Sequence, residues 1–253
     1  MAAFTFPSNA LKIGIITQAR MTSTRLPGKV MKLIAGKPVL KHHIERLLQT
    51  DFPVFIATTV NETDNPIIDF CLENNVPFNR GDEQNVLSRF YFCAQENNLD
   101  VVVRVTSDCP LIAPELLKNG IETYLKTRDP YLYLSNALVR TFPRGLDFEI
   151  FSFSLLERAF KEATRPEDQE HVTPYIHQNR TGDINFFHFK NPENKSNYRI
   201  TLDTPEDFEL LRILIEDYNA DKLSGSDIIN LLDAHPELVA INAEVEQKKL
   251  SDK

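Results

Sequence analysis

Residues 12–29 read KIGIITQARMTSTRLPGK, and this stretch says more about the fold than any other part of the chain. It joins a short apolar run, KIGIIT, to a loop that contains Arg20, Arg25 and Lys29 beside hydroxyl side chains and a Pro-Gly turn. A short apolar run bounded by turn residues indicates a buried β-strand. In an α/β sheet, the loop after such a strand lies at the carboxyl edge, where ligands bind. The stretch therefore predicts an α/β fold with a positively charged binding loop.

Strand-like and helix-like segments alternate from residue 12 to about residue 126. Strands are expected at 12–17, 53–59, 76–81 and 100–106, and helices at 38–50, 64–75 (with Asp64 as N-cap), 83–98 and from Pro114 to 126. This alternation is typical of a parallel sheet with helices on both faces. Later, strands are expected at 131–139, 145–152 and 183–190, two of them pairing antiparallel, and helices at 154–163, 170–179, 204–218 and 226–235. We predict one mixed α/β domain over residues 11–253, preceded by a flexible leader at residues 1–10.

Composition excludes several classes of protein. The formal net charge of −8 and pI of about 5.3 argue against general nucleic-acid binding, which usually shows a basic face. The three cysteines have no C-x-x-C spacing, so we expect reduced thiols rather than a disulfide framework or a zinc site. No apolar stretch approaches the roughly 18 residues that span a membrane, and residues 1–12 lack the pattern of a signal peptide. We therefore expect a cytoplasmic protein.

Three glycine-based phosphate-binding loops do not fit the segment. A Rossmann fingerprint requires G-x-G-x-x-G between strand and helix, but the segment has glycine only at positions 14, 28 and 36, the first within the strand. A P-loop requires G-x-x-x-x-G-K-[ST]; here Ser23 takes the place of the first glycine and Val30 that of the hydroxyl residue. The glycine-rich loop of protein kinases fails for lack of glycine. What remains is a loop that reaches an anion with its side chains.

Arginine and lysine side chains can form such a clamp. Each pair of unit charges 4 Å apart contributes about 1 kcal/mol in water and about 4 kcal/mol at an effective dielectric constant of 20. Several such pairs could hold a triphosphate despite the negative charge of the whole chain. Composition alone leaves open the alternative that this is a solvated surface loop.

The longer stretch ARMTSTRLPGKVMKLIAGKPVLKHHIERL resembles the opening signature of sugar-activating cytidylyltransferases. That family includes CMP-Kdo synthetases and acylneuraminate cytidylyltransferases, and the resemblance is closest to its spore-coat polysaccharide biosynthesis branch. It continues in order through NRGDEQNVLSRFYFCAQ, VVVRVTSDCPLIAPELL, TFPRGLDFEIFS, EDQEHVTPYIHQN and NYRITLDTPEDFELL. Because it covers nearly the whole chain, the resemblance is specific.

The resemblance implies a fold and an activity. The fold is a Rossmann-like nucleotidyltransferase α/β/α sandwich with a mostly parallel central sheet and a smaller α+β subregion for dimerisation and acceptor binding. The activity is transfer of CMP from CTP to a sugar or sugar-acid acceptor for surface glycan synthesis, with release of pyrophosphate. Homodimers are common in the family, so a homodimer is expected, with no nucleic-acid or membrane partner.

The resemblance also implies a nucleotide and metal site. By motif position, Asp108 in TSDCP and Asp203 in TLDTPED correspond to aspartates that bind Mg²⁺, and Lys29, Arg20 and Asp108 take part in catalysis. The residues expected to bind the nucleotide are Arg20, Ser23, Arg25, Lys29, Arg80, Thr106 and Asp108. Structural alternatives stay open: Asp108 is also a good turn residue, and Thr204 with Pro205 is also a helix start.

The acceptor side is less defined. His171, Arg144 and Glu149 are candidate acceptor-binding residues; Arg144 suits an acidic or phosphorylated acceptor, and Glu149 is either a carboxylate at the edge of the core or an acceptor of sugar hydroxyls. Many relatives have glycine where this chain has Ser107, which bears on the turn before Asp108. The identity of the acceptor does not follow from the sequence. Two other hypotheses are the same fold with a different nucleotide or a phosphorylated non-sugar acceptor, and a non-catalytic nucleotide-binding partner.

Overall fold

The computed structural model describes residues 11–247, so the predicted leader at residues 1–10 lies outside the described range. Within that range, seven strands form one sheet in the order β5–β4–β1–β6–β8–β7–β9. They are β1 (Ile13–Gln18), β4 (Val54–Thr59), β5 (Phe78–Gly81), β6 (Val101–Thr106), β7 (Leu132–Ser135), β8 (Glu149–Ser152) and β9 (Asn185–His188). A small hairpin of β2 (Leu33–Ile34) and β3 (Lys37–Pro38), which the sequence did not predict, stands apart from the sheet.

The sheet is mostly parallel, as predicted. Strands β5, β4, β1 and β6 are parallel neighbours, with Ile15 opposite Val54 and Ile13 opposite Val101. Strand β8 runs antiparallel to β6 and β7, which confirms the expected antiparallel pair in the second half, and β9 is parallel to β7. Strands β1 and β4 are almost entirely buried, because unbroken apolar runs suit a sheet that is covered on both faces.

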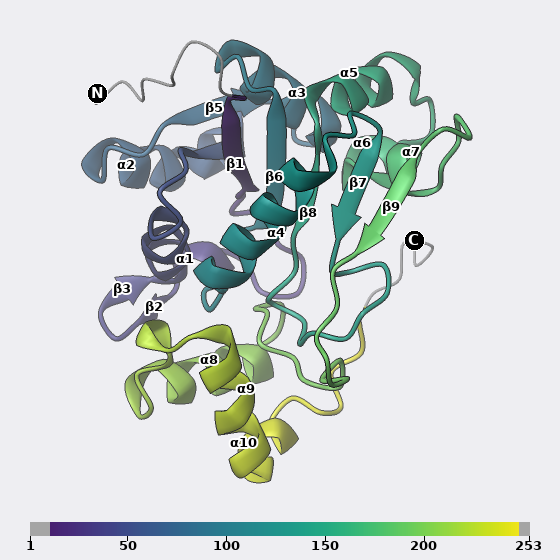
Figure 1. Ribbon diagram of the computed structural model, residues 1–253. Helices are drawn as coiled ribbons and strands as arrows, with labels where there is room; N and C mark the ends of the chain where they lie inside the picture. The colour runs from purple at the N-terminus through teal and green to yellow at the C-terminus, as the bar shows by residue number, and fades with distance from the viewer. Residues whose placement is uncertain (1–10, 248–253) are drawn as a thin grey trace.

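Helices cover both faces of the sheet (Figure 1). Those on one face are α1 (Val39–Leu48), α2 (Asn65–Glu73) and α4 (Pro114–Thr127); those on the other are α3 (Val86–Glu96), α5 (Phe153–Glu162), α6 (Pro166–His171) and α7 (Pro174–His177). Successive strand residues point to opposite faces, so Ile15 packs in the first core and Ile16 in the second. The predicted α/β/α sandwich is confirmed.

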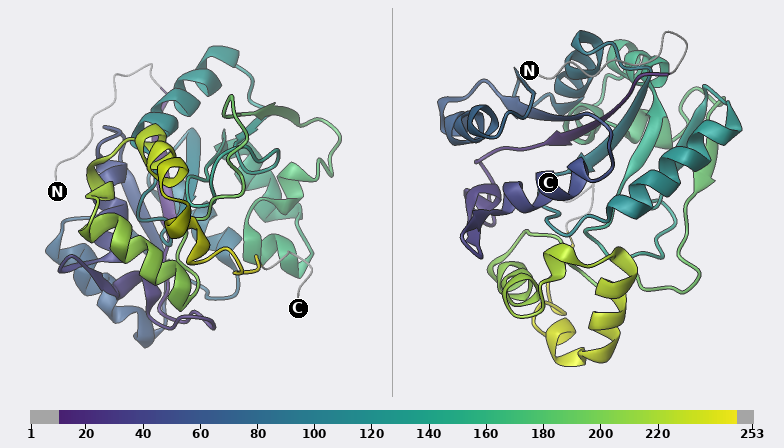
Figure 2. Two further views of the ribbon diagram at one scale, coloured as in Figure 1. Left: turned by 90° about the horizontal axis from the view of Figure 1, so that it is seen from below. Right: turned by 60° about the vertical axis from the view of Figure 1, so that its left-hand side comes forward.

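A third group of helices lies beyond the carboxyl ends of β1 and β6 (Figures 1 and 2). It consists of α8 (Pro205–Glu216), α9 (Gly225–Ala234) and α10 (Pro236–Ala240), and α10 was not predicted. Its apolar core includes Leu211 and Ile228 and packs on Ile34 and Leu111, which belong to the first half of the chain. This packing brings the start of α8 beside the loop that follows β1.

Helix α3 starts later than predicted. It begins at Val86 rather than Glu83. The carboxylate of Asp82 accepts hydrogen bonds from the backbone N–H groups of Gln84 and Asn85 and holds this segment in a turn. The side chain of Asn85 then caps the helix by accepting from the backbone N–H of Ser88 at 2.9 Å.

The single helix predicted over 170–179 is also wrong. Val172 has φ 71° and ψ −53°, and the N–H of Thr173 donates to the carbonyl of His171 at 2.8 Å. This is a γ-turn of the rare, strained form, and a β-branched residue seldom adopts a positive φ. Helix α6 therefore ends at His171, and α7 starts at Pro174.

Candidate active site

A cleft of about 1060 Å³ opens at the carboxyl ends of β1 and β6. Its walls come from the loop after β1, the turn after β6, the segment between β7 and β8, and helices α6 and α7. The predicted site residues that line it are Arg20, Ser23, Arg25, Lys29, Thr106, Asp108, Arg144, Glu149, His171 and Asp203. The structure thus gathers into one cleft residues that are up to 183 positions apart in the sequence.

Arg80 is the predicted site residue that does not line this cleft. It lies on β5, at the edge of the sheet, and its guanidinium donates to the carbonyls of Thr59 and Asn61 at 2.8 and 3.1 Å. These bonds join the ends of two neighbouring strands. The described geometry therefore gives Arg80 a structural contact rather than a place in the cleft.

Lys29 joins the two predicted metal-binding aspartates. Its ammonium donates to Asp108 Oδ2, to Asp203 Oδ1 and to the carbonyl of Leu202, each at 2.8 Å. Asp108 follows β6, whereas Asp203 precedes α8, where Thr204 forms the predicted N-cap as part of a capping box. The end of a central strand and the start of a helix from the third group therefore meet at one cation.

Ion pairing affects the pKa values of Lys29 and Asp108 more strongly than burial does. Burial disfavours the charged form of Lys29, but Asp108 and Asp203 more than offset it, and the pKa of Lys29 is raised. Burial likewise acts to raise the pKa of Asp108, yet the Lys29 ammonium dominates and holds that pKa below its usual value. Lys29 and Asp108 are therefore both charged at neutral pH.

The carboxylate of Asp64 anchors the loop after β1. Asp64 is the N-cap residue of α2, as predicted, but its carboxylate makes no capping bond there. It is buried, accepts from Thr59 and Thr58, and receives the backbone N–H of Met21 at 2.7 Å. The predicted N-cap position of Asp64 is thus confirmed, but its carboxylate fixes the loop between strand ends instead of capping the helix.

The side chains of this loop face the cleft with different degrees of constraint. Arg25 pairs with Asp203 Oδ2 at 3.0 Å. Arg20 is 46% exposed and reaches Glu83 only at 3.5 Å, which leaves it free to turn toward a ligand. Ser23 accepts weakly from the backbone N–H of Leu26 at 3.5 Å, so its hydroxyl proton is available for donation.

The turn before Asp108 is held by a buried polar chain. Ser107 donates to the carbonyl of Gln18 and lies 3.2 Å from the hydroxyl of Thr17. Thr17 contacts Nε2 of His43 at 3.0 Å, and Nδ1 of His43 lies 2.8 Å from the carbonyl of Cys109. Since a carbonyl only accepts, Nδ1 carries the proton, and burial lowers the pKa of His43 to about 4. The Ser107 side chain thus adds a tie between β1 and β6.

Glu149, at the start of β8, lines the cleft and belongs to a buried network. Its carboxylate pairs with Arg104 and accepts from Tyr133 and, at 2.7 Å, from Thr173. Burial would raise the pKa of Glu149, but Arg104 and the two hydroxyls outweigh it, and the pKa is lowered. The γ-turn at Val172 directs Thr173 toward Glu149 while His171 lines the cleft. The three partners support a structural role for Glu149, and its place in the cleft supports a role in binding the acceptor.

Arg144 is a half-buried arginine that also lines the cleft. Burial and the neighbouring charge of Arg140 lower its pKa. Within residues 11–247, Arg140 pairs with Asp147, but Arg144 forms no ion pair. A partly desolvated cation that forms no ion pair within the described residues suits an anionic ligand.

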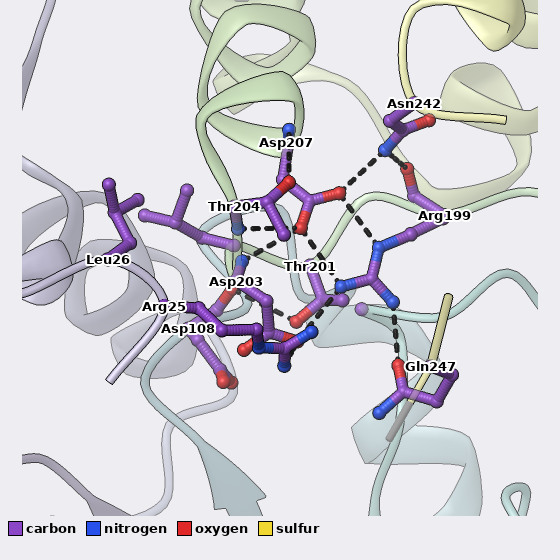
Figure 3. A network of polar contacts seen from close by, with 12 residues as sticks. Arg25, Leu26, Asp108, Arg199, Thr201, Asp203, Thr204, Asp207, Asn242 and Gln247 are labelled. Carbon is purple, nitrogen blue, oxygen red and sulfur yellow. Dashed lines mark hydrogen bonds and ion pairs between the residues drawn. The ribbon is translucent and has the colours of Figure 1, made fainter. Parts of the chain in front are cut away.

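Two arginines of this region were not predicted from the sequence. Arg104 interrupts the β-branched run DVVVRVT, and Arg199 lies between Tyr198 and Ile200 in a similar apolar setting. A charged residue inside an otherwise buried run signals a paired charge, because an unpaired one is very costly to bury. Figure 3 shows Arg199 between Asp203, Asp207 and Gln247.

Asp108 and Asp203 fit a hard cation. Together with the carbonyl of Leu202 they offer oxygen atoms that already converge on one positive group, the Lys29 ammonium. Mg²⁺ prefers such ligands and often takes one or two protein carboxylates together with substrate phosphates. In the described part of the chain, no group of three or more histidine, cysteine or acidic side chains is placed to bind a metal. The donor set therefore matches a cation that phosphate oxygens complete.

No helix in the described residues is both long and apolar enough to cross a membrane. The three cysteines are buried and unpaired, in agreement with the expectation of free thiols.

Comparison with known proteins gives consistent results. A family model described as cytidylyltransferase matches residues 13–228. An uncharacterized protein of Methanocaldococcus jannaschii is 36% identical over 240 residues, covering 93% of this chain and 96% of the relative. The spore coat polysaccharide biosynthesis protein SpsF of Bacillus subtilis is 33% identical over 232 residues, covering 88% and 94%. A solved structure of a cytidylyltransferase from Leptospira borgpetersenii has a TM-score of 0.87 at 33% identity, covering 95% of this chain and all of that one.

Proposed function

This chain belongs to the cytidylyltransferase family, and from that premise we propose that it transfers CMP from CTP to a hydroxyl oxygen of a sugar or sugar acid for glycan biosynthesis. The observation that carries this proposal is the junction of Lys29, Asp108 and Asp203 at one wall of the cleft. It places two carboxylates and a basic loop where a nucleotide binds in α/β folds. The relative named for spore-coat polysaccharide synthesis supports a glycan pathway.

In this reaction the acceptor oxygen forms a bond to the α-phosphorus of CTP while the bond from that phosphorus to the bridging oxygen breaks. The acceptor hydroxyl loses its proton, and pyrophosphate leaves with the bond electrons. The protein's task is mainly to position the groups and to balance charge. Arg20, Arg25 and Lys29 line the cleft on one side and supply positive charge for the triphosphate. Ser23 adds a hydroxyl donor beside them.

We further propose that Asp108 and Asp203 hold Mg²⁺ together with phosphate oxygens of CTP. When bound, the cation supplies charge neutralisation at the phosphates and lowers the pKa of a coordinated hydroxyl. The Lys29 ammonium lies between the two carboxylates and contacts both of them. It thereby keeps two negative groups close together before the substrate arrives.

We assign the acceptor to Arg144, His171 and the Glu149 network, because these residues line the cleft beside the proposed nucleotide site. The partly desolvated Arg144 guanidinium favours an acceptor with a carboxylate or phosphate. A sugar acid meets this requirement and also offers a hydroxyl nucleophile. Arg144 thus supports an anionic class of acceptor.

We also propose a homodimer that pairs through β9. This strand is at the edge of the described sheet, and Phe186 and Phe187, which point to opposite faces, are 37% and 39% exposed. An uncovered edge strand with apolar side chains is a ready template for pairing, and a second copy of the same chain covers it symmetrically. Light scattering of the 29.0 kDa chain and of Phe187→Lys tests this: a dimer that becomes a monomer supports it, and a monomeric wild type contradicts it.

The activity is tested directly by incubating the protein with CTP, Mg²⁺ and a panel of ulosonic acids and sugar phosphates while pyrophosphate is assayed. Calorimetry with each of the four nucleoside triphosphates establishes the nucleotide preference. Acceptor-dependent pyrophosphate release with CTP supports the proposal. A lack of release across the panel together with a lack of CTP binding contradicts it.

A further inference from the structure

A buried arginine, Arg199, contacts the carboxylate of Asp203 (Figure 3). The guanidinium of Arg199 donates to both carboxylate oxygens of Asp207, at 2.8 and 2.9 Å, and to Asp203 Oδ2 at 2.9 Å. Asn242, in the turn after α10, donates to Asp207 Oδ1 at 2.8 Å and to the carbonyl of Arg199 at 3.1 Å. Arg199, Asp207 and Asn242 are 8%, 0% and 4% exposed, so these bonds form away from solvent.

The two oxygens of Asp203 have different partners. Oδ1 faces Lys29, which also binds Asp108, whereas Oδ2 faces Arg199 and Arg25. Arg25 and Lys29 come from the loop after β1 and line the cleft, where a triphosphate can draw them away. Arg199 is not among the residues that line the cleft, and its two hydrogen bonds to Asp207 hold its guanidinium in place.

The backbone supports this arrangement. Arg144 and Arg199 form a parallel β-bridge, and a Cβ atom on Gly145 would come within 2.6 Å of the carbonyl oxygen of Ile200. Gly145 has φ 104°, a conformation that suits glycine. Arg199 is therefore fixed at its backbone as well as at its side chain.

We propose that Arg199 is a positioning residue for the reaction: it holds Asp203 through Oδ2 and so keeps Oδ1 directed toward Asp108, where both carboxylates can share one cation. Asp207 and Asn242 hold Arg199 in turn. This inference rests on the proposed function, because it assigns the Asp108–Asp203 pair to cation binding. It also makes the chain after α10 part of the active site, since Asn242 closes the network and Gln247 contacts Arg199 Nη1 at 2.6 Å.

The test compares binding of CTP with and without a cation in Arg199→Lys. Lysine keeps the charge but cannot make the forked contact with Asp203 and Asp207 at once. Binding of the Mn²⁺ complex of CTP is followed by the paramagnetic resonance of Mn²⁺, and binding of CTP in EDTA is followed by calorimetry. The matched control is Arg158→Lys, which alters a forked pair with Asp183 outside the cleft, at 2.8 and 3.0 Å.

We expect Arg199→Lys to weaken binding of the Mn²⁺–CTP complex about tenfold, as loss of a partner behind a metal ligand commonly does, and to leave metal-free CTP binding unchanged. The control should match the wild type in both assays. Wild-type affinity of a folded Arg199→Lys for Mn²⁺–CTP overturns the inference, and so does an equal loss with and without the cation.

If Arg199→Lys does not fold, the positioning role of Arg199 is tested with Asn242→Ala instead. It removes one support of Arg199 and should show a smaller loss, again confined to the Mn²⁺ complex. Wild-type affinity for Mn²⁺–CTP in a folded Asn242→Ala then overturns the inference. A wild-type protein that binds no CTP at all contradicts the proposed function itself and this inference with it, whereas intact wild-type binding with unaffected variants contradicts only the role of Arg199.

Discussion

Lys29 donates a hydrogen bond of 2.8 Å to Asp108, a residue 79 positions later in the chain, and thereby joins the loop after β1 to the turn after β6. Around this bond, the cations Lys29, Arg25 and Arg199 face the carboxylates of Asp108, Asp203 and Asp207. The junction is thus balanced in charge before any ligand binds. A triphosphate adds several negative charges, so its binding at this place calls for an additional cation.

Replacing Lys29 by methionine should make the protein dependent on a cation for its stability. The change leaves Asp108 without its cationic partner, and the free energy of unfolding should fall by about 1–3 kcal/mol. Mg²⁺ should then raise the melting temperature of Lys29→Met more than that of the wild type, because it can take the place of the ammonium. Differential scanning calorimetry with and without Mg²⁺ measures both effects.

Lys195→Met is a suitable control for that experiment. Lys195 pairs with Asp233 at 2.8 Å outside the cleft, so its loss should not change the response to Mg²⁺. An identical Mg²⁺ response in Lys29→Met and the wild type would argue that the carboxylate pair does not bind the cation.

Replacing Asp108 by asparagine should abolish most of the turnover without loss of the fold. The amide is nearly the same size as the carboxylate but is a poor ligand for Mg²⁺. We expect acceptor-dependent pyrophosphate release to fall at least about 100-fold, which corresponds to about 2.7 kcal/mol of transition-state stabilisation. CTP binding in EDTA should be retained, because a negative charge near the phosphates has been removed.

Asp183→Asn provides the comparison for Asp108→Asn, since Asp183 pairs with Arg158 away from the cleft. Its turnover should equal that of the wild type. Activity of Asp108→Asn within a few-fold of the wild type would refute a role for this carboxylate in the reaction.

Much of the fold could be predicted because its signals are local. The apolar run that forms β1 and the Thr204–Pro205 helix start each depend on neighbouring residues, and both were found in the structure. The resemblance supplied Lys29, Asp108 and Asp203 by motif position, and the structure brings all three together. Their roles in binding CTP and Mg²⁺ remain predictions.

The features that escaped prediction depend on tertiary contacts. Asp64 has the sequence context of a helix cap, but the nearby N–H of Met21 competes for its carboxylate. The positive φ of Val172 has no local signal, since β-branched residues seldom adopt it. The environment of Arg199 depends on Asn242, which lies 43 positions away in the sequence, in the turn after α10.

Replacing Arg144 by methionine should weaken binding of the acceptor and leave binding of CTP unchanged. A charge-assisted hydrogen bond contributes about 1.5–3 kcal/mol, so the acceptor KM should rise about 10- to 100-fold for an anionic acceptor. Arg212→Met, which alters an exposed pair on α8, should leave both KM values unchanged. If only the KM for CTP rises in Arg144→Met, this arginine belongs to the nucleotide side of the cleft instead.

Replacing Glu149 by glutamine separates the two interpretations of this carboxylate. If it is mainly structural, the change leaves the Arg104 guanidinium without its buried partner, and the free energy of unfolding at pH 7 should fall by about 2–4 kcal/mol. The folded-state pKa of Glu149 lies below its ordinary value of 4.5, so its contribution to stability is complete above pH 4.5 and is lost as the pH falls toward the folded pKa. The difference in the free energy of unfolding between wild type and Glu149→Gln should therefore be constant from pH 7 to about pH 5 and become smaller below that.

Urea unfolding at a series of pH values measures this difference. The control is Glu157→Gln, which removes an exposed ion pair with Lys161 and should change the free energy of unfolding only slightly. A raised acceptor KM with no stability gap would instead assign Glu149 to recognition of the sugar hydroxyls.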